Sequence, residues 1–396
     1  MKKLGILLLC ISVLVILGCM PQNQQMTKPN SSEVSTESET EESVCNETVV
    51  TIPTEKESLP PIDPIDQILD QMTIEQKVGQ LFLVACPDTD AVEQIRQYQF
   101  GGIVLFGKDL AGQTPETLRK FLHEIQMAST IPILIAVDEE GGSVCRVSSQ
   151  SAFRNHRFQS PGNILEAGGL ELLKQTEMEK CQLLKKLGIN VNLAPVCDIA
   201  TEPEAFMYSR SLRQKPLDTA ESVAAIVNIM NKMCIGSVLK HFPGYGNNVD
   251  THYSEAIDER PLEKLEKEDL LPFQAGIDSG ANAILVSHTV VAALDDKMPA
   301  SLSLPVHMYL REKMQFNGVV ITDDLKMAAI SEAFGDEEAA VLAVIAGNDM
   351  LCLWEYKMQY KAVVEAVRTG RISMEKMNDS IRRILSWKQQ LGILEF

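Results

Sequence analysis

Short runs of hydrophobic residues alternate with longer amphipathic segments over most of the chain. Eight runs have the length and the continuous apolar character of strands that are buried on both faces. They are Leu81–Cys86, Gly102–Phe106, Ile133–Asp138, Val191–Asp198, Ser237–His241, Ala283–His288, Val319–Asp323 and Met350–Leu353. Segments between them, such as Thr114–Met127 and Ala220–Met233, repeat apolar residues at helical spacing. This alternation predicts an α/β fold in which right-handed helical crossovers join parallel strands.

Eight strand–helix units favour a (β/α)8 barrel of the TIM type over an open, doubly wound sheet. No GxGxxG motif follows the first strand and no GxxxxGK motif ending in Ser or Thr occurs, which weakens the nucleotide-binding alternatives. In such a barrel the functional side chains gather at the carboxyl ends of the strands. Polar residues close the predicted strands at that end: Asp138 with Glu140, Asp198, Lys240 with His241, His288, and Asp323 with Asp324. We therefore expect one functional pocket there.

The first 62 residues have a different pattern. Lys2 and Lys3 precede an apolar run, Leu4–Leu17, that is too short to span a membrane comfortably. The run ends in Ile16-Leu17-Gly18-Cys19, which resembles the lipobox of bacterial lipoproteins. The resemblance implies a signal peptide over residues 1–18, lipid attachment to Cys19, and a membrane-anchored protein on the extracellular face of the bacterial cytoplasmic membrane. An uncleaved signal anchor is the alternative.

Residues 19–62 are rich in Ser, Thr, Glu, Gln and Pro, and eight glutamates in this stretch face only two lysines. Such a composition buries too little apolar surface to offset the entropy of ordering the chain, so we expect a disordered acidic tether. Residues 63–396 then form a single barrel domain. The formal net charge of the chain is −18 and no basic cluster offers a phosphate-binding surface, so we expect no nucleic acid partner.

Nine cysteines are present, but neither a CxxC pair nor a regular spacing indicates a zinc site or a disulfide framework. Three of them precede the barrel domain. We expect the other six to be free, buried thiols. These six are Cys86, Cys145, Cys181, Cys197, Cys234 and Cys352.

The segment after the fifth strand is rich in Gly, Pro and Asn, which is typical of a long loop. Asp250 and His252 lie on it, two residues apart. A carboxylate at that spacing can bond one imidazole nitrogen, orient the ring and support its charged form. A histidine with a pKa near ~6.5 can then give and take a proton at neutral pH. A surface loop without a catalytic role is the alternative.

Strand seven ends in Asp323-Asp324, and one of these side chains points to the barrel mouth because strand side chains alternate. A carboxylate opposite a mobile acid/base is the arrangement that double-displacement glycoside hydrolysis needs. Asp324 is also a candidate N-cap of the next helix. After strand three, Asp138, Glu140 and Arg146 surround a diglycine turn, where carboxylate and guanidinium groups can bind sugar hydroxyls or form a structural ion pair.

Together these segments resemble glycoside hydrolase family 3, in its bacterial β-N-acetylglucosaminidase branch. Lys240–Gly246 resembles the KHFPGHG signature, and Asp250–His252 the D-S/T-H element. Thr322–Met327 is similar to SDDLxM and Asp138–Arg146 to DxEGGRVxR. The similarity continues in segments near both ends of the barrel domain and in one between them: Met72–Phe82, Ser209–Ser211 and Ala346–Met350.

The resemblance implies a retaining exo-β-N-acetylglucosaminidase that acts on glycans ending in N-acetylglucosamine, with no metal or organic cofactor. Asp323 aligns with the nucleophile, His252 with the acid/base and Asp250 with its partner. Five residues align with those that hold the terminal sugar: Asp138, Arg146, Arg210, Lys240 and His241.

Three positions depart from the family pattern. Tyr245 stands where the second His of KHFPGHG is usual, Ser143 replaces an Arg, and Leu212 replaces a Phe. We expect an altered loop with catalysis retained, and the Ser143 change leaves the fine substrate preference open.

Other readings remain. A second family 3 activity, β-glucosidase or phosphorylase, is chemically reasonable, because a His acid/base does not repel phosphate. A lipoprotein that binds glycans or muropeptides without cleaving them is the non-enzyme alternative. A metal-dependent barrel hydrolase lacks the HxH pair expected on its first strand.

Overall fold

The computed structural model describes residues 63–246 and 256–396. Eight parallel strands form its centre, and each lies within or overlaps one of the eight apolar runs. They are β1 (Phe82–Ala85), β2 (Gly102–Leu105), β3 (Leu134–Val137), β6 (Val191–Asn192), β7 (Gly236–Phe242), β9 (Ala283–Val286), β11 (Val319–Thr322) and β12 (Leu351–Leu353). The predicted strand–helix alternation is therefore confirmed.

The strands close into a barrel. Their hydrogen-bonded order is β11-β9-β7-β6-β3-β2-β1-β12, so neighbours in the sheet are also neighbours in the chain, except that the first strand pairs with the last. The remaining gap lies between β11 and β12. There the Thr322 N–H donates to the Met350 carbonyl at 3.1 Å, and the Met350 N–H donates to the Val320 carbonyl at 3.0 Å. The expected TIM-type (β/α)8 barrel is confirmed.

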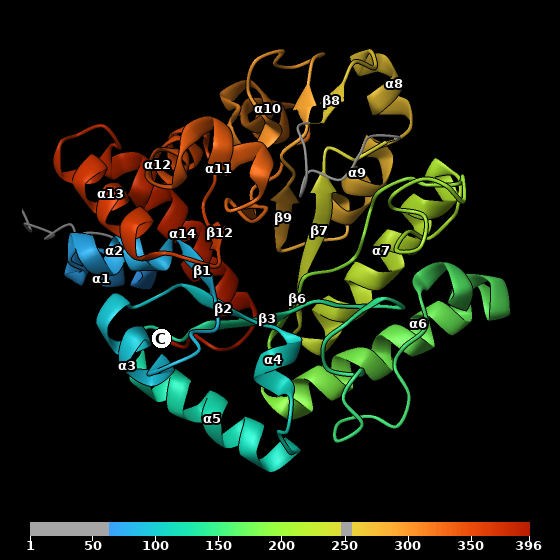
Figure 1. The fold of residues 1–396 in the computed structure, drawn as a ribbon, viewed down its shortest axis with the longest axis horizontal. Helices are drawn as coiled ribbons and strands as arrows, with labels where there is room; N and C mark the ends of the chain where they lie inside the picture. Colours follow the sequence, from blue (N-terminus) through green and yellow to red (C-terminus); the bar gives the residue numbers. More distant parts are fainter. Residues whose placement is uncertain (1–62, 247–255) are drawn as a thin grey trace, which may run out of the picture. The chain divides into compact units, whose positions relative to one another are not determined.

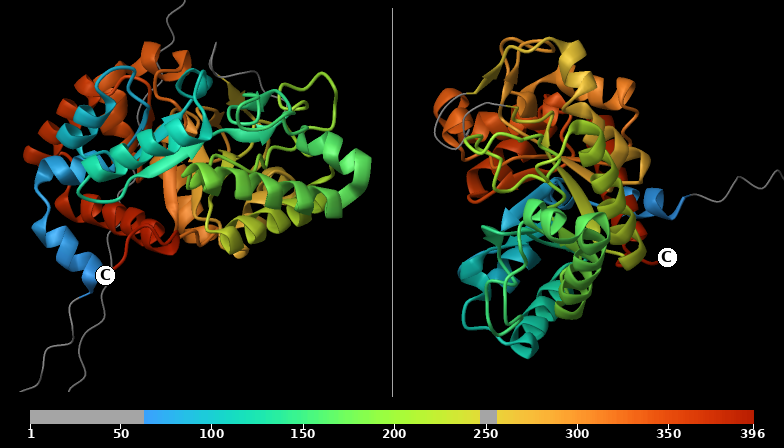
Figure 2. Two further views of the ribbon diagram at one scale, coloured as in Figure 1. Left: turned by 90° about the horizontal axis from the view of Figure 1, so that it is seen from below. Right: turned by 90° about the vertical axis from the view of Figure 1, so that its right-hand side faces the viewer.

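The strands are continuous apolar runs because both of their faces are covered. Every residue of β1, β2, β3, β9 and β11 is buried, with side chains filling the barrel on one face and packing under helices on the other. Phe82, Ile103 and Ile321 have no exposed surface. Helices surround the strands in Figure 1 and flank them in both views of Figure 2.

Fourteen α-helices are described. They are α1 (Pro64–Gln71), α2 (Ile74–Gln80), α3 (Ala91–Tyr98), α4 (Gly107–Leu110), α5 (Pro115–Ala128), α6 (Pro161–Leu187), α7 (Pro216–Met233), α8 (Leu262–Lys267), α9 (Leu270–Asp278), α10 (Leu304–Met308), α11 (Ala328–Phe334), α12 (Asp336–Ala346), α13 (Lys357–Arg368) and α14 (Met374–Gln390). A 3-10 turn (Ala300–Leu302) and a π-helical turn (Tyr309–Lys313) flank α10. No described helix is long and apolar enough to cross a membrane.

Local sequence explains where these helices begin and which face they bury. In α5, the Thr114 hydroxyl accepts from the Thr117 N–H and Pro115 occupies the first turn. Leu118, Leu122 and Ile125 then recur at helical spacing and are buried. The predicted helix over Thr114–Met127 is therefore confirmed. The one over Ala220–Met233 is also confirmed, with a first turn that begins four residues earlier at Pro216.

Two short strand pairs lie outside the barrel. Directly after β3, β4 (Glu139–Gly141) and β5 (Val144–Cys145) form a hairpin around the predicted diglycine turn. Gly141 has φ 114°, and a Cβ there would lie 2.2 Å from the Gln159 carbonyl oxygen, so the turn requires glycine. The second pair joins β8 (Ile257–Asp258) in parallel to β10 (Val290–Val291).

The cysteine prediction is confirmed in large part. The six cysteines of the described barrel are free. Four are buried and Cys352 is half-buried, but Cys234 is exposed. The expectation of burial is wrong for Cys234 because it follows the last turn of α7 as its C-cap, with φ 55°, where the chain turns at the surface.

Candidate active site

Strand ends from around the barrel enclose one cavity of about 210 Å³. Its walls combine charged side chains with aromatic and aliphatic ones. The polar members are Asp138, Arg146, Arg210, Lys240, His241, Tyr245, Asp323 and Asp324. Six of the eight proposed catalytic and sugar-binding residues are thus brought together at the carboxyl ends of the strands, as expected for this fold. The other two, Asp250 and His252, lie outside the described residues.

Lys240, at the end of β7, is the central cation of the cavity wall. Its Nζ lies 2.7 Å from Asp138 Oδ1 and 2.6 Å from Glu140 Oε1, and its side chain is only 3% exposed. Burial disfavours the charged ammonium, but the Asp138 and Glu140 carboxylates outweigh it and raise the pKa of Lys240. The ammonium is therefore held charged, with its donors directed at the cavity wall.

Glu140 joins two cations from different parts of the barrel. Its carboxylate accepts from Arg210 Nε at 2.9 Å and from Arg210 Nη2 at 2.6 Å, in addition to Lys240. The side chain is 1% exposed. Burial alone would raise the pKa of this carboxyl, but Lys240 and Arg210 overcome it and hold the pKa well below its ordinary value. Glu140 thus positions two cations that face the cavity.

His241 is oriented by Asp198, which follows β6. Asp198 Oδ2 accepts from the His241 backbone N–H at 3.1 Å and lies 2.8 Å from His241 Nδ1. Because a carboxylate only accepts, this contact places the proton on Nδ1. Nε2 is then the acceptor that faces Arg210 Nη2 at 3.4 Å. Asp198 Oδ1 also accepts from the Tyr245 N–H at 2.8 Å, so one carboxylate holds both ends of the turn after β7.

Arg146, the residue directly after β5, completes this side of the cavity. Its Nη2 lies 3.9 Å from Asp138 Oδ2, and its guanidinium lies 5.8 Å from the centre of the Phe106 ring. Its Nε atom is buried and has no hydrogen-bond partner among the described residues. The loose pairing leaves the guanidinium able to donate to a bound hydroxyl group.

Asp323, the residue directly after β11, lines the same cavity. Its backbone N–H donates to the Val286 carbonyl at 2.9 Å, and its Oδ1 accepts from the Asp324 N–H at 2.9 Å. The prediction that Asp324 is the N-cap of the next helix is wrong, because α11 begins at Ala328 and Met327 occupies the N-cap position. Asp324 Oδ1 instead accepts from the Lys326 N–H at 3.1 Å, which closes a turn between the strand and the helix.

Residues 73–387 match the model of the glycosyl hydrolase family 3 N terminal domain. The chain belongs to glycosyl hydrolase family 3. The curated "Beta-hexosaminidase LpqI" of Mycobacterium tuberculosis is 29% identical over 326 residues, which cover 79% of this chain and 82% of the relative. A beta-hexosaminidase of Nitrosomonas eutropha is 31% identical over 270 residues, covering 67% of this chain and 76% of the relative.

A solved structure carries the same similarity. The family 3 β-N-acetylglucosaminidase from Paenibacillus sp. matches with a TM-score of 0.76 and 32% identity, over 81% of this chain and 63% of that longer chain. The chain is thus a glycoside hydrolase of the β-hexosaminidase branch of family 3. The assignment of individual roles to its site residues stays a prediction.

The structure shows where the three residues that depart from the family 3 pattern lie relative to the cavity. Tyr245 is buried, and its ring packs edge-on against His241 at 5.3 Å and Phe206 at 5.4 Å. Leu212 is buried in the core. Ser143 is exposed in the β4–β5 turn and does not line the cavity. Tyr245 is the departure that contacts the site, and it does so through packing on the oriented His241.

The sequence analysis gave Glu140 two alternatives, sugar binding or a structural ion pair, and the structure shows it in ion pairs with Arg210 and Lys240. It placed Asp198 among the strand-end residues without giving it a role. It missed three aromatic residues of the cavity wall, Phe106, Phe206 and Trp354, of which Phe106 ends the second apolar run and Trp354 directly follows β12. The ring centres of Phe106 and Trp354 lie 4.2 Å apart. The strand-end rule would have found both, had it been applied to aromatic residues as well. No group of three or more His, Cys, Asp or Glu residues able to hold a metal ion occurs in residues 63–246 and 256–396.

Proposed function

We propose that the chain is a retaining exo-β-N-acetylglucosaminidase that releases terminal, non-reducing β-linked N-acetylglucosamine. The observation that carries this proposal is a small cavity in which Asp323 faces a buried set of paired charges. The names of the relatives, β-hexosaminidase and β-N-acetylglucosaminidase, support the choice of sugar.

The proposed reaction has two steps. Asp323 attacks the anomeric carbon, the bond to the leaving oxygen breaks, and the acid/base gives that oxygen a proton. Water then attacks the glycosyl–Asp323 ester, the acid/base takes a proton from it, and the sugar leaves with its original configuration. We assign the acid/base role to His252 with Asp250 as its partner. The Asp324 N–H holds Asp323 Oδ1 at 2.9 Å, which orients the carboxylate for attack.

The charged wall would bind the terminal sugar through its hydroxyl groups. Asp138 accepts hydrogen bonds, while Lys240 and Arg146 donate them, so hydroxyls that both donate and accept are satisfied together. A cavity of about 210 Å³ lies below the ~300–1,000 Å³ usual for larger ligands, which favours a single sugar unit and exo cleavage.

We also propose that the protein is exported and anchored by a lipid at Cys19, with residues 19–62 as a tether, and that cell-wall fragments are its substrates. The support is the lipobox-like sequence and the acidic composition of this stretch. Labelling cells with a fatty-acid analogue tests it. The full chain should be labelled and membrane-bound, and Cys19→Ala should be neither. Equal labelling of both chains would contradict the anchor.

An aryl β-N-acetylglucosaminide tests the reaction directly. The purified chain should release the aryl group, whereas Asp323→Ala and His252→Ala should lose nearly all turnover. Undiminished turnover by Asp323→Ala, or faster turnover of the aryl glucoside, would refute the proposal. Product analysis with and without phosphate distinguishes hydrolysis from phosphorolysis, since only the latter yields the sugar 1-phosphate.

A further inference from the structure

Arg210 reaches the catalytic cavity from irregular backbone, unlike the other residues proposed to hold the terminal sugar. Those lie on a barrel strand or directly after a strand, as Lys240 on β7 and Arg146 after β5 do. Arg210 lies in residues 193–215, which join β6 to α7 and contain no helix and no strand beyond an isolated bridge of Val196 with Lys240. Backbone without a hydrogen-bond ladder keeps its conformational entropy unless side chains pack it in place. Packing must therefore hold Arg210 at the cavity wall.

A small hydrophobic cluster, separate from the barrel core, packs this segment. Its seven members are Val196, Ala200, Ala205, Phe206, Met207, Tyr208 and Tyr245, and we call it the Tyr245 cluster. Six of the seven belong to the segment itself, whereas Tyr245 comes from the turn after β7. Small satellite clusters of this kind are typical of the packing beneath long loops. Within the cluster, Tyr245 is thus the side chain that ties the segment to the barrel strands.

The ring of Tyr245 makes this tie between two other rings. It is buried and packs edge-on against Phe206 of the segment at 5.4 Å and against His241 of β7 at 5.3 Å. Edge-on contacts between aromatic rings stabilise beyond the apolar area that they bury. The family 3 signature has a histidine at position 245, and a phenol ring covers more apolar surface than an imidazole. The tie is therefore a feature of this chain and not of the family pattern.

Met207 passes the packing on to Arg210. It is 1% exposed, and its carbonyl accepts from the N–H groups of Arg210 at 3.0 Å and Ser211 at 2.8 Å. Arg210 Nη1 donates to the Met207 Sδ at 3.7 Å, while Nε and Nη2 donate to Glu140 at 2.9 and 2.6 Å. One edge of the guanidinium thus meets the Tyr245 cluster and the other meets a buried carboxylate, which together fix its plane.

We propose that Met207 and Tyr245 are positioning residues for Arg210. The Tyr245 cluster fixes the irregular segment on the end of β7, and through Met207 it holds the guanidinium against Glu140. The inference rests on the proposed function, because that function gives Arg210 a terminal sugar to hold. Without the cluster, the ion pair with Glu140 opens more often and the sugar is bound more weakly.

Arginine-selective labelling tests the positioning without any substrate. Phenylglyoxal reacts with a free guanidinium, so Arg210 is labelled through the fraction of molecules in which its pair with Glu140 is open. Mass spectrometry of the peptides gives the labelling rate at Arg210 alone. Met207→Ala and Tyr245→Ala should each raise this rate about tenfold, which corresponds to about 1.4 kcal/mol in the opening equilibrium. Tyr245→Phe keeps the ring and should stay within about twofold of the wild type.

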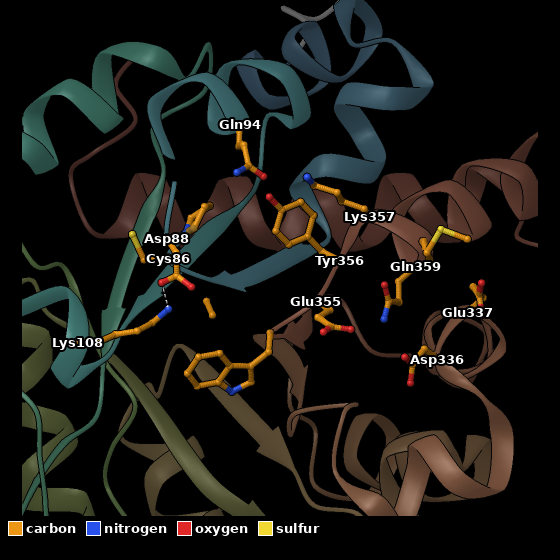
Figure 3. A pocket seen from close by; sticks show the side chains of 14 residues that line it. Cys86, Asp88, Gln94, Lys108, Asp336, Glu337, Glu355, Tyr356, Lys357 and Gln359 are labelled. Carbon is orange, nitrogen blue, oxygen red and sulfur yellow. Dashed lines mark hydrogen bonds and ion pairs between the residues drawn. The ribbon is translucent and has the colours of Figure 1, made fainter. Parts of the chain in front are cut away.

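A buried tyrosine at the same end of the barrel provides the matched control for Tyr245. Tyr356 lines a second cavity of about 410 Å³, which the segments after β1 and β12 enclose (Figure 3). Like Tyr245 it is buried, and it packs edge-on against two rings, Phe100 at 4.7 Å and Tyr98 at 5.4 Å. It does not line the catalytic cavity. Tyr356→Ala should therefore lower Tm as Tyr245→Ala does but leave the labelling of Arg210 within about twofold of the wild type.

The control for Met207 is Met377→Ala. Met377 is buried in the barrel core on α14 and does not line the catalytic cavity. The substitution removes the same atoms from a buried site and should lower Tm without changing the labelling rate at Arg210.

Kinetics with an aryl β-N-acetylglucosaminide show whether the effect passes through Arg210. Met207 does not line the cavity, so Met207→Ala changes the site only through its neighbours. It should lower kcat/KM about tenfold, mainly through KM, because a sugar contact made in both the ground state and the transition state is weakened. In an Arg210→Ala background the same substitution should change kcat/KM by less than about twofold.

Labelling of Arg210 at the wild-type rate in either Met207→Ala or Tyr245→Ala, or equally fast labelling in the control variants, would overturn the positioning role. A loss of kcat/KM that persists in the Arg210→Ala background would do the same. Absence of turnover by the wild type would refute the proposed function instead, and the labelling comparison would still decide whether the Tyr245 cluster positions Arg210.

Discussion

Glu140→Gln is the substitution that most directly tests how the charged wall of the catalytic cavity works. The change keeps the shape of the side chain but removes its negative charge, which leaves Lys240 and Arg210 facing Asp138 alone. Glu140 is 1% exposed and accepts from Arg210 at 2.6 and 2.9 Å. Breaking a buried ion pair from one side costs about 3–5 kcal/mol, because the remaining charge stays buried without compensation.

Two quantities should fall together in this variant. With an unfolding entropy of about 2.1 cal/mol/K per residue, a barrel of this length should lose roughly 4–7 °C in Tm. If two charged hydrogen bonds worth about 1.5 kcal/mol each also cease to position the cations, kcat/KM for an aryl β-N-acetylglucosaminide should drop on the order of a hundredfold. Differential scanning calorimetry and steady-state kinetics at 25 °C measure the two effects.

Asp349→Asn separates the loss of stability from the loss of the site. Asp349 is also 1% exposed and bridges two cations, Arg311 at 2.6 Å and Arg383 at 3.0 Å, but it precedes β12 at the opposite end of the barrel. A similar fall in Tm with kcat/KM within about threefold of the wild type is expected. If Glu140→Gln retained wild-type kcat/KM, or if Asp349→Asn lost as much, the positioning role of Glu140 would be wrong.

The carboxylate of Glu140 should also make the stability of the folded chain depend on pH. Its pKa is depressed in the folded chain, so its stabilisation is fully present above the ordinary value of 4.5 and is lost as the pH falls below that value. The wild type should therefore lose more unfolding free energy than Glu140→Gln between pH 5 and pH 3. Denaturant titrations followed by circular dichroism measure the difference, and parallel losses in the two chains would contradict the assignment.

Three further changes give sharp expectations. Asp198→Asn weakens the orientation of His241 and should lower kcat/KM about tenfold with a small change in Tm, whereas an unchanged kcat/KM would remove Asp198 from the site. Lys388 is fully buried, and burial lowers its pKa to about 7. The unfolding free energy of the wild type should therefore rise from pH 7 toward pH 10. Urea titrations of Lys388→Met should show no such rise. Gly141→Ala places a Cβ against the Gln159 carbonyl at φ 114° and should destabilise the barrel by about 2 kcal/mol or more; an unchanged Tm would refute this strain.

Much of the fold followed from local pattern alone. A continuous apolar run such as Val319–Thr322 has no polar face to expose to water, so its hydrophobicity already indicates a central parallel strand that is covered on both faces. Polar residues at the ends of five of the runs are equally visible in the sequence, and they predict that Asp138, Lys240 and Asp323 are neighbours. Their proximity needs only the rule that parallel strands end on one edge.

Predictions from the local sequence pattern are wrong where they depend on the path that the backbone takes after a strand or helix ends. Asp324 was a reasonable N-cap, but a turn of three residues separates it from α11. Cys234 looked like another buried thiol, yet α7 ends just before it and the chain turns outward. Both differences arise over a few residues, at positions where hydrophobic periodicity stops and carries no further information.

By itself the sequence determined the number of the barrel strands and their positions along the chain, the barrel class, the family resemblance and the set of charged residues at the strand ends. Only the tertiary structure decided which charges pair. Glu140 and Arg210 are 70 residues apart in the chain, and Lys240 and Asp138 are 102 apart. It also decided that the segments after β1 and β12 form a second cavity beside the first. The physical reason is that periodicity reports burial along one segment, whereas the ion pairs depend on β3, β6 and β7 lying side by side and the second cavity depends on the pairing of β1 with β12.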